Sequence, residues 1–150
     1  MNNPQEESME KTYSLADYDK ITDIIRKRVP NLPQVGLILG SGLGELADSV
    51  SQALTIPYNE LPGWPVSTVE GHKGRLVFGA LEGQNVMVVQ GRVHYYEGYS
   101  MQEVTLSVRV MQRLGVKALI VTNAAGAINP EFTPGDLMLI TDHIGLVTMA

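Results

Sequence analysis

The chain has 150 residues, and 16 Asp and Glu against 11 Lys and Arg give it a formal net charge of −5. This length suits a single domain, and 44% apolar with 18% charged residues indicate a globular chain rather than a disordered one. The acidic balance argues against nucleic-acid binding, and the absence of cysteine excludes disulfides, a thiolate nucleophile and a cysteine-based zinc site.

The N-terminal region predicts a polar tail followed by a helix. Residues 1–13 contain neither the basic stretch nor the apolar core of a secretory signal, so we expect a flexible tail on a cytoplasmic protein without a membrane partner. Apolar residues recur at helical spacing from Ser14, which forms a capping-box pattern with Asp17. Pro30 ends the predicted helix.

Residues 34–39 form a short apolar run, typical of a strand buried on both faces of a parallel sheet. A glycine-rich turn follows over residues 40–44, and the apolar spacing behind it predicts a helix. The backbone N–H groups of this turn and the Ser41 hydroxyl are hydrogen-bond donors at the start of the predicted helix, where they could bind an anion. The turn matches neither the dinucleotide-binding fingerprint nor the P-loop, and a bare strand-to-helix turn is the alternative.

The middle of the chain predicts an irregular stretch and then a hairpin. Residues 53–73 contain several prolines and glycines and read as irregular. The apolar runs 75–81 and 85–90 flank a turn at Glu82-Gly83-Gln84. His72 lies between glycines just before the hairpin, where it belongs either to a lid over an anion or to an exposed turn.

Residues 91–99 form a loop with an unusual concentration of reactive side chains. Arg92 can grip an oxyanion with two N–H groups, and His94 can donate a proton or hydrogen bond near neutral pH. Glu97 can orient His94 through the other ring nitrogen, and the three tyrosines can stack on a sugar or base. The alternative is a solvated loop whose tyrosines pack its underside.

The last third predicts one helix and two strands. A capping box begins the helix at Ser100, and Gly115 fits its C-terminal cap. The apolar runs 117–122 and 136–141 predict buried strands. This order of elements predicts an α/β fold with a mixed central sheet flanked by helices, with 85–90, the helix and 117–122 forming a right-handed parallel crossover.

Three polar segments, 40–44, 91–97 and 122–126, follow strands that we expect to be parallel. Ligands bind beyond the carboxyl ends of such strands, so these segments are predicted to meet at one cleft. Arg92 and His94 there would hold a dianion such as phosphate, beside aromatic groups suited to a sugar. The three histidines have no metal-ligand spacing, and we expect no metal site.

Four blocks resemble the trimeric purine nucleoside phosphorylases: GSGLG (40–44), STVEGHKGRLVFG (67–79), QGRVHYYEGY (90–99) and VTNAAGAINP (121–130). The resemblance implies the nucleoside phosphorylase fold and a homotrimer. It also implies phosphate-dependent cleavage of purine (deoxy)ribonucleosides, favouring 6-oxopurines, to the free base and (deoxy)ribose 1-phosphate. Phosphate is then a co-substrate, and no cofactor or metal is implied.

The resemblance also implies roles for individual residues. Arg92 and His94 are the implied catalytic residues, and Tyr96 contacts the nucleoside at its ribose. The implied phosphate-binding set is Ser41, His72, Arg92, Val93, His94, Asn123 and the backbone of Ala124.

Family members are substantially longer, and their purine-recognising residues lie in the C-terminal half. We therefore expect residues 14–150 to be the N-terminal part of one phosphorylase domain, incomplete and inactive alone. Two other functions stay open: a methylthioadenosine-type nucleoside phosphorylase and a non-catalytic nucleotide-binding module.

Overall fold

The computed structural model describes residues 12–66 and 73–145. The tail expected over residues 1–13 lies almost wholly outside this part, as does His72. The first described element is helix α1 (Leu15–Arg28), which begins at the predicted capping box: the Ser14 hydroxyl accepts from the Asp17 N–H, and the Asp17 carboxylate accepts from the Ser14 N–H at 3.0 Å. Ile21 and Ile25 are fully buried on its inner face.

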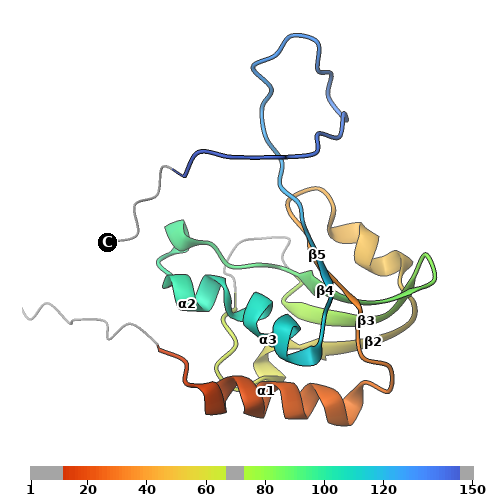
Figure 1. The fold of residues 1–150 in the computed structure, drawn as a ribbon, viewed down its shortest axis with the longest axis vertical. Helices are drawn as coiled ribbons and strands as arrows, with labels where there is room; N and C mark the ends of the chain where they lie inside the picture. The colour runs from red at the N-terminus through yellow and green to blue at the C-terminus, as the bar shows by residue number, and fades with distance from the viewer. Residues whose placement is uncertain (1–11, 67–72, 146–150) are drawn as a thin grey trace, which may run out of the picture.

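Five strands form one mixed sheet in the order β2-β3-β4-β1-β5, which confirms the expected architecture (Figure 1). Strand β1 lies between β4 and β5 and is parallel to both, whereas β2, β3 and β4 pair antiparallel. The strands are β1 (Val35–Ile38), β2 (Ser51–Pro57), β3 (Arg75–Leu81), β4 (Gln84–Gln90) and β5 (Ala118–Val121).

Helices cover the two faces of the sheet unequally. On one face α1 and α3 (Leu106–Leu114) bury an apolar cluster against the strands, and the short α2 (Met101–Val104) precedes α3 (Figure 1). On the other face the 3-10 helix η1 (Gly44–Ser49) supplies Ala47 to a smaller cluster with Leu37 and Val88. Two further 3-10 helices are η2 (Tyr58–Glu60) and η3 (Tyr95–Glu97).

The stretch expected to be irregular from residue 53 begins instead with strand β2. Pro57 suggested a loop, but it ends a strand at the sheet edge, where its missing N–H removes no ladder bond. The helix expected after the glycine-rich turn is the six-residue η1. It offers fewer aligned peptide dipoles than the expected helix, so an anion there would rely on the N–H groups of the turn.

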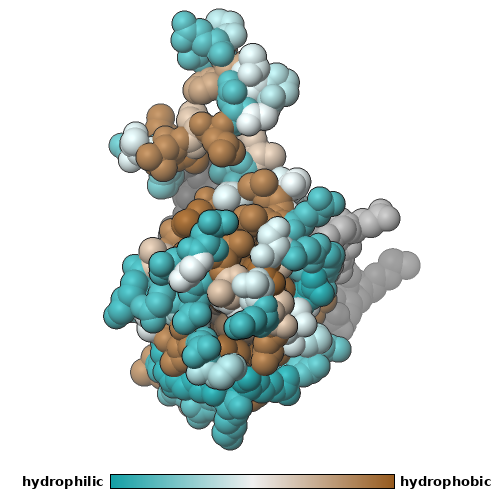
Figure 2. Space-filling view, turned by 90° about the vertical axis from the view of Figure 1, so that its right-hand side faces the viewer, coloured by the Kyte–Doolittle hydropathy of each residue, from teal (hydrophilic) through white to brown (hydrophobic). Residues whose placement is uncertain are grey.

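The prediction of buried strands at 117–122 and 136–141 is wrong in two respects. Strand β5 forms, but it is the outer strand of the described sheet, and Ile120 and Val121 are 51% and 57% exposed. Residues 136–141 form no strand, and Leu137 is 92% exposed. A buried strand needs neighbouring ladders and an apolar cover. The described residues give β5 a ladder on the β1 side alone, and they give residues 136–141 no ladder. Figure 2 shows apolar side chains on this projecting segment.

Candidate functional site

The carboxyl ends of three parallel strands meet at one edge of the sheet, as predicted. Beyond β1, the Gly40 N–H donates to the Thr122 hydroxyl beyond β5 at 2.8 Å. Beyond β4, Nη1 of Arg92 donates to the Thr122 carbonyl at 2.7 Å. A Cβ atom at position 40 would lie 2.5 Å from that carbonyl oxygen, so only glycine permits this close backbone approach. Thr122 therefore joins all three segments.

Arg92, His94 and Glu97 form a chain of side-chain contacts at this edge. Nε of Arg92 donates to Nε2 of His94 at 3.1 Å. Nδ1 of His94 lies 2.6 Å from Oε1 of Glu97, and the same oxygen accepts from the His94 backbone N–H at 2.8 Å. The Glu97 side chain is only 6% exposed. The expected orientation of His94 by Glu97 is therefore present in the geometry.

Arg92 and Glu97 together determine where the His94 proton resides. A guanidinium has only donors, so Nε2 of His94 must accept, and the proton of a neutral ring lies on Nδ1, directed at Glu97. The bonds to His94 and Thr122 leave further N–H groups of the half-buried Arg92 for an oxyanion. A fixed cation with spare donors suits a phosphate oxygen.

Tyr96 and Tyr99 have different positions in the same loop. The Tyr96 ring stacks on His94 with centroids 4.7 Å apart and is 78% exposed, so its outer face is open to a ligand. The Tyr99 hydroxyl donates to the Val66 carbonyl at 2.6 Å and ties the loop to the body. One tyrosine thus anchors the loop, as the alternative interpretation expected, while another flanks the Arg92–His94 pair.

The remaining predicted site residues are not gathered around this pair. Ser41 is exposed in the turn beyond β1, and no hydrogen bond joins it to Arg92 or His94 in the described chain. Asn123 and Ala124 are exposed beyond β5, where the Asn123 amide donates to the Ala124 carbonyl at 3.3 Å. Their convergence on a phosphate stays a prediction.

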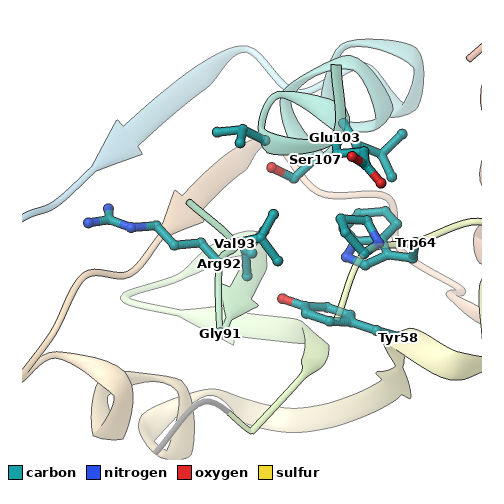
Figure 3. Close-up of a pocket in the computed structure, with 11 residues that line it drawn as sticks. Tyr58, Trp64, Gly91, Arg92, Val93, Glu103 and Ser107 are labelled. Atoms are coloured by element: carbon teal, nitrogen blue, oxygen red, sulfur yellow. The ribbon is translucent and has the colours of Figure 1, made fainter. Parts of the chain in front are cut away.

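A cavity lies beneath the loop and is distinct from its charged side (Figure 3). The Val93 side chain is buried there, facing Trp64 and Tyr58, so only the Val93 backbone is left for a ligand. The Arg92 guanidinium extends away from this cavity. The Tyr58 hydroxyl is buried and makes no hydrogen bond to any residue that the structure describes, and burial raises the pKa of Tyr58.

A polar cluster beside the glycine-rich turn was missed by sequence reasoning. Arg75 donates through Nε to Gln90 at 2.6 Å and through Nη2 to Asp48 at 3.1 Å. Lys73 also donates to Asp48, at 2.9 Å, and this bond, with a smaller contribution from Arg75, lowers the pKa of the Asp48 carboxyl. The sequence offered one signal for this cluster: Gln90 is a polar residue at the end of an apolar run, where it would need polar partners.

Within residues 12–66 and 73–145, no three His, Cys, Asp or Glu side chains are grouped so that they could hold a metal ion. The helices of this part of the chain also lack the length and apolar character needed to cross a membrane.

Comparisons with known proteins agree on one family. Residues 34–149 match the model of the phosphorylase superfamily. The chain is 60% identical over 126 residues to purine nucleoside phosphorylase 1 of Geobacillus stearothermophilus, covering 84% of this chain and 46% of that protein. It is 51% identical over 138 residues to the purine nucleoside phosphorylase of Rattus norvegicus, covering 92% and 48%.

Solved structures give the same result. The purine nucleoside phosphorylase of Schistosoma mansoni in complex with adenosine has a TM-score of 0.76 at 47% identity, over 84% of this chain and 44% of that one. A purine nucleoside phosphorylase in complex with ribose-1-phosphate has a TM-score of 0.77 at 48% identity, over 85% and 47%. The chain thus spans about half the length of the relatives that it matches.

Proposed function

Because the chain belongs to the phosphorylase superfamily, we propose that it acts in purine nucleoside phosphorolysis, with inorganic phosphate as co-substrate and no metal or cofactor. The substrates are purine ribonucleosides and deoxyribonucleosides, preferentially those of 6-oxopurines, and the products are the free base and the (deoxy)ribose 1-phosphate. The proposal includes a homotrimer located in the cytoplasm and a role in purine salvage.

The observation that carries this proposal is the Arg92–His94–Glu97 chain, tied to Thr122 where three strands end. A phosphate dianion needs a fixed cation and several donors, and Arg92 supplies both. Ser41, the turn around it, and the Asn123–Ala124 backbone lie on flanking segments of the same edge and would complete the phosphate site. Tyr96, stacked on His94, offers an aromatic face to the ribose.

In the proposed reaction, a phosphate oxygen forms a bond to the anomeric carbon while the bond from that carbon to the purine nitrogen breaks. The electron pair of the broken bond leaves with the purine, which takes up a proton, and the configuration at the anomeric carbon inverts. The transition state carries positive charge on the ribose, so catalysis consists of positioning and electrostatic stabilisation.

His94 contributes in one of two protonation states. Neutral, it accepts from Arg92 and fixes the direction of the guanidinium. Protonated, it donates from Nε2 to the anion, and the nearby Glu97 carboxylate stabilises the imidazolium. When His94 is protonated, phosphate binding would therefore replace the bond between Arg92 and His94 by two bonds, one from each side chain to phosphate.

The test measures phosphate dependence in the full-length gene product. Hypoxanthine release from inosine is followed with and without phosphate, and ribose 1-phosphate is identified as the second product. Arg92→Ala should lower the rate at least about tenfold, while Arg109→Ala, an exposed arginine on α3, should not. Phosphate-independent release of base would indicate a hydrolase. Nucleotide binding without turnover would indicate a binding module.

A further inference from the structure

Gln90 ends strand β4 with a buried amide at the edge of the sheet that carries the candidate site. Its side chain is 3% exposed, and a polar group so buried needs partners. The amide oxygen accepts from Nε of Arg75 at 2.6 Å, and the amide nitrogen donates to the Gly44 carbonyl at 2.7 Å. Since a guanidinium only donates and a carbonyl only accepts, this amide has one orientation.

Gly44 is where the glycine-rich turn ends and η1 begins. At the far end of η1, Asp48 accepts from Lys73 and Arg75. Arg75 therefore connects to η1 twice, directly through Asp48 and indirectly through Gln90. Both connections come from the start of β3 and the end of β4, which pair in register at Arg75 and Gln90.

Among the residues that the structure describes, few contacts hold the middle of the glycine-rich turn. Its exposed middle contains Gly42 in the left-handed region, with φ of +85°, and one internal hydrogen bond from the Leu43 N–H to the Gly40 carbonyl at 3.2 Å. Its two ends are anchored differently: Gly40 donates to Thr122, and Gly44 accepts from Gln90. Ser41 thus lies between two fixed points of the turn. One is the bond from Gly40 to Thr122, which also binds Arg92, and the other is the bond from Gln90 to Gly44.

We propose that Gln90 is a positioning residue for phosphate binding, acting through Gly44 to hold the turn that carries Ser41. This inference rests on the proposed function, because it takes phosphate as the anion. Gln90 touches no reacting atom. Its effect is to keep the N–H groups of Ser41 and Gly42 and the Ser41 hydroxyl in one arrangement, so that phosphate binding does not have to order the turn.

Gln90→Glu separates the two bonds of the amide. A carboxylate of the same shape still accepts from Arg75, with a stronger, charge-assisted bond. It cannot donate to the Gly44 carbonyl and repels it. The variant therefore keeps the link within the sheet and breaks the link to the turn. Gln84→Glu is the matched control, because it adds the same charge at the exposed first residue of the same strand.

The experiment measures phosphorolysis of inosine by the full-length gene product, with KM determined separately for phosphate and for inosine. Gln90→Glu should raise the KM for phosphate about fivefold or more, the effect of losing one hydrogen bond that preorganises the site, and change the KM for inosine less than about twofold. Gln84→Glu should change neither. A purely structural role would lower the melting temperature without this separation of the two constants.

A folded Gln90→Glu variant with the wild-type KM for phosphate overturns the inference. If that variant does not fold, Gln90→Asn decides by the same comparison, since its shorter amide cannot span from Arg75 to Gly44. Calorimetric titration with inorganic phosphate alone separates the two proposals. Phosphate binding weakened by Gln90→Glu in a protein without turnover would refute the proposed function and support the role of Gln90.

Discussion

Arg92 and His94 are two residues apart in the chain and joined through their side chains, with Nε of the arginine 3.1 Å from Nε2 of the histidine. The contact assigns the only lone pair of the neutral ring to the arginine and directs the ring proton at Glu97. In this loop the His94 ring therefore lies between the cationic Arg92 side chain and the anionic Glu97 side chain and contacts both. A phosphate that approaches Arg92 meets a guanidinium whose direction is already fixed.

Glu97→Gln tests whether the Glu97 carboxylate supports the role of His94 in phosphate binding. The glutamine oxygen can still accept from Nδ1 of His94, so the ring orientation should persist, but the charge that stabilises an imidazolium is lost. We expect kcat/KM for phosphate to fall about tenfold, equivalent to about 1.4 kcal/mol. A Glu97→Gln variant with the wild-type kcat/KM for phosphate would contradict this role of Glu97.

Arg92→Lys tests whether phosphate binding needs the paired N–H groups of the Arg92 guanidinium in addition to its charge. Lysine keeps the charge but lacks the planar guanidinium, which can donate to the Thr122 carbonyl and present two parallel N–H groups to phosphate oxygens at the same time. Phosphorolysis should fall at least about tenfold. The melting temperature should stay near that of the wild type because the residue is in a loop. Full activity would refute the assignment, and a collapsed melting temperature would make Arg92 a structural residue.

Ser41→Ala tests the turn. Ser41 is exposed, so its loss should leave stability unchanged, whereas phosphate binding should weaken by about 1–2 kcal/mol, the value of one hydrogen bond to a charged group. The KM for inosine should change less. An unaltered KM for phosphate would show that the turn only connects β1 to η1.

Tyr58→Phe and Tyr13→Phe should have opposite effects on stability. The Tyr58 hydroxyl is buried without a partner among the described residues, so removing it should raise the free energy of unfolding by about 1 kcal/mol. The Tyr13 hydroxyl donates to the Gly63 carbonyl at 2.6 Å, and its removal should cost about 0.5–1.5 kcal/mol. Denaturant unfolding measures both, and a destabilised Tyr58→Phe would reveal a bonded hydroxyl.

Asp48 provides a pH test of the cluster beside the turn. Its pKa is held below the usual 3.8, first by the hydrogen bond from Lys73, so ionised Asp48 stabilises the fold above that pH and loses this contribution as the pH falls through the lowered pKa. NMR titration should find the pKa of Asp48 below 3.8 and nearer to that value in Lys73→Met. An equal pKa in both proteins would mean that Lys73 does not hold the carboxylate.

The sequence predicts those parts of the structure that depend on neighbours along the chain. The capping boxes at Ser14 and Ser100 and the hairpin of β3 and β4 are confirmed because each depends on residues within a few positions. The meeting of three segments also follows from local signals, since the carboxyl ends of parallel strands share an edge.

The parts that could not be predicted depend on contacts between distant segments. Thr122 joins two other segments through its hydroxyl and carbonyl, and neither bond has a signature in the sequence. Gln90 depends on Arg75 and Gly44, which only the folded sheet brings to it. The exposure of residues 136–141 has the same origin, because an apolar pattern predicts burial without supplying the surface that covers it.

The outward edge of β5 has a consequence for handling a polypeptide of these 150 residues. Within residues 12–66 and 73–145, no strand pairs with the outer side of β5, whose Ile120 and Val121 are exposed, and the uncharged apolar run from Leu137 to Ile140 is exposed as well. Such an edge is a template for strand addition between molecules, so self-association should grow with concentration and begin with β-sheet pairing rather than with unfolding. A lysine at position 120 would oppose it by placing charge on the pairing strand.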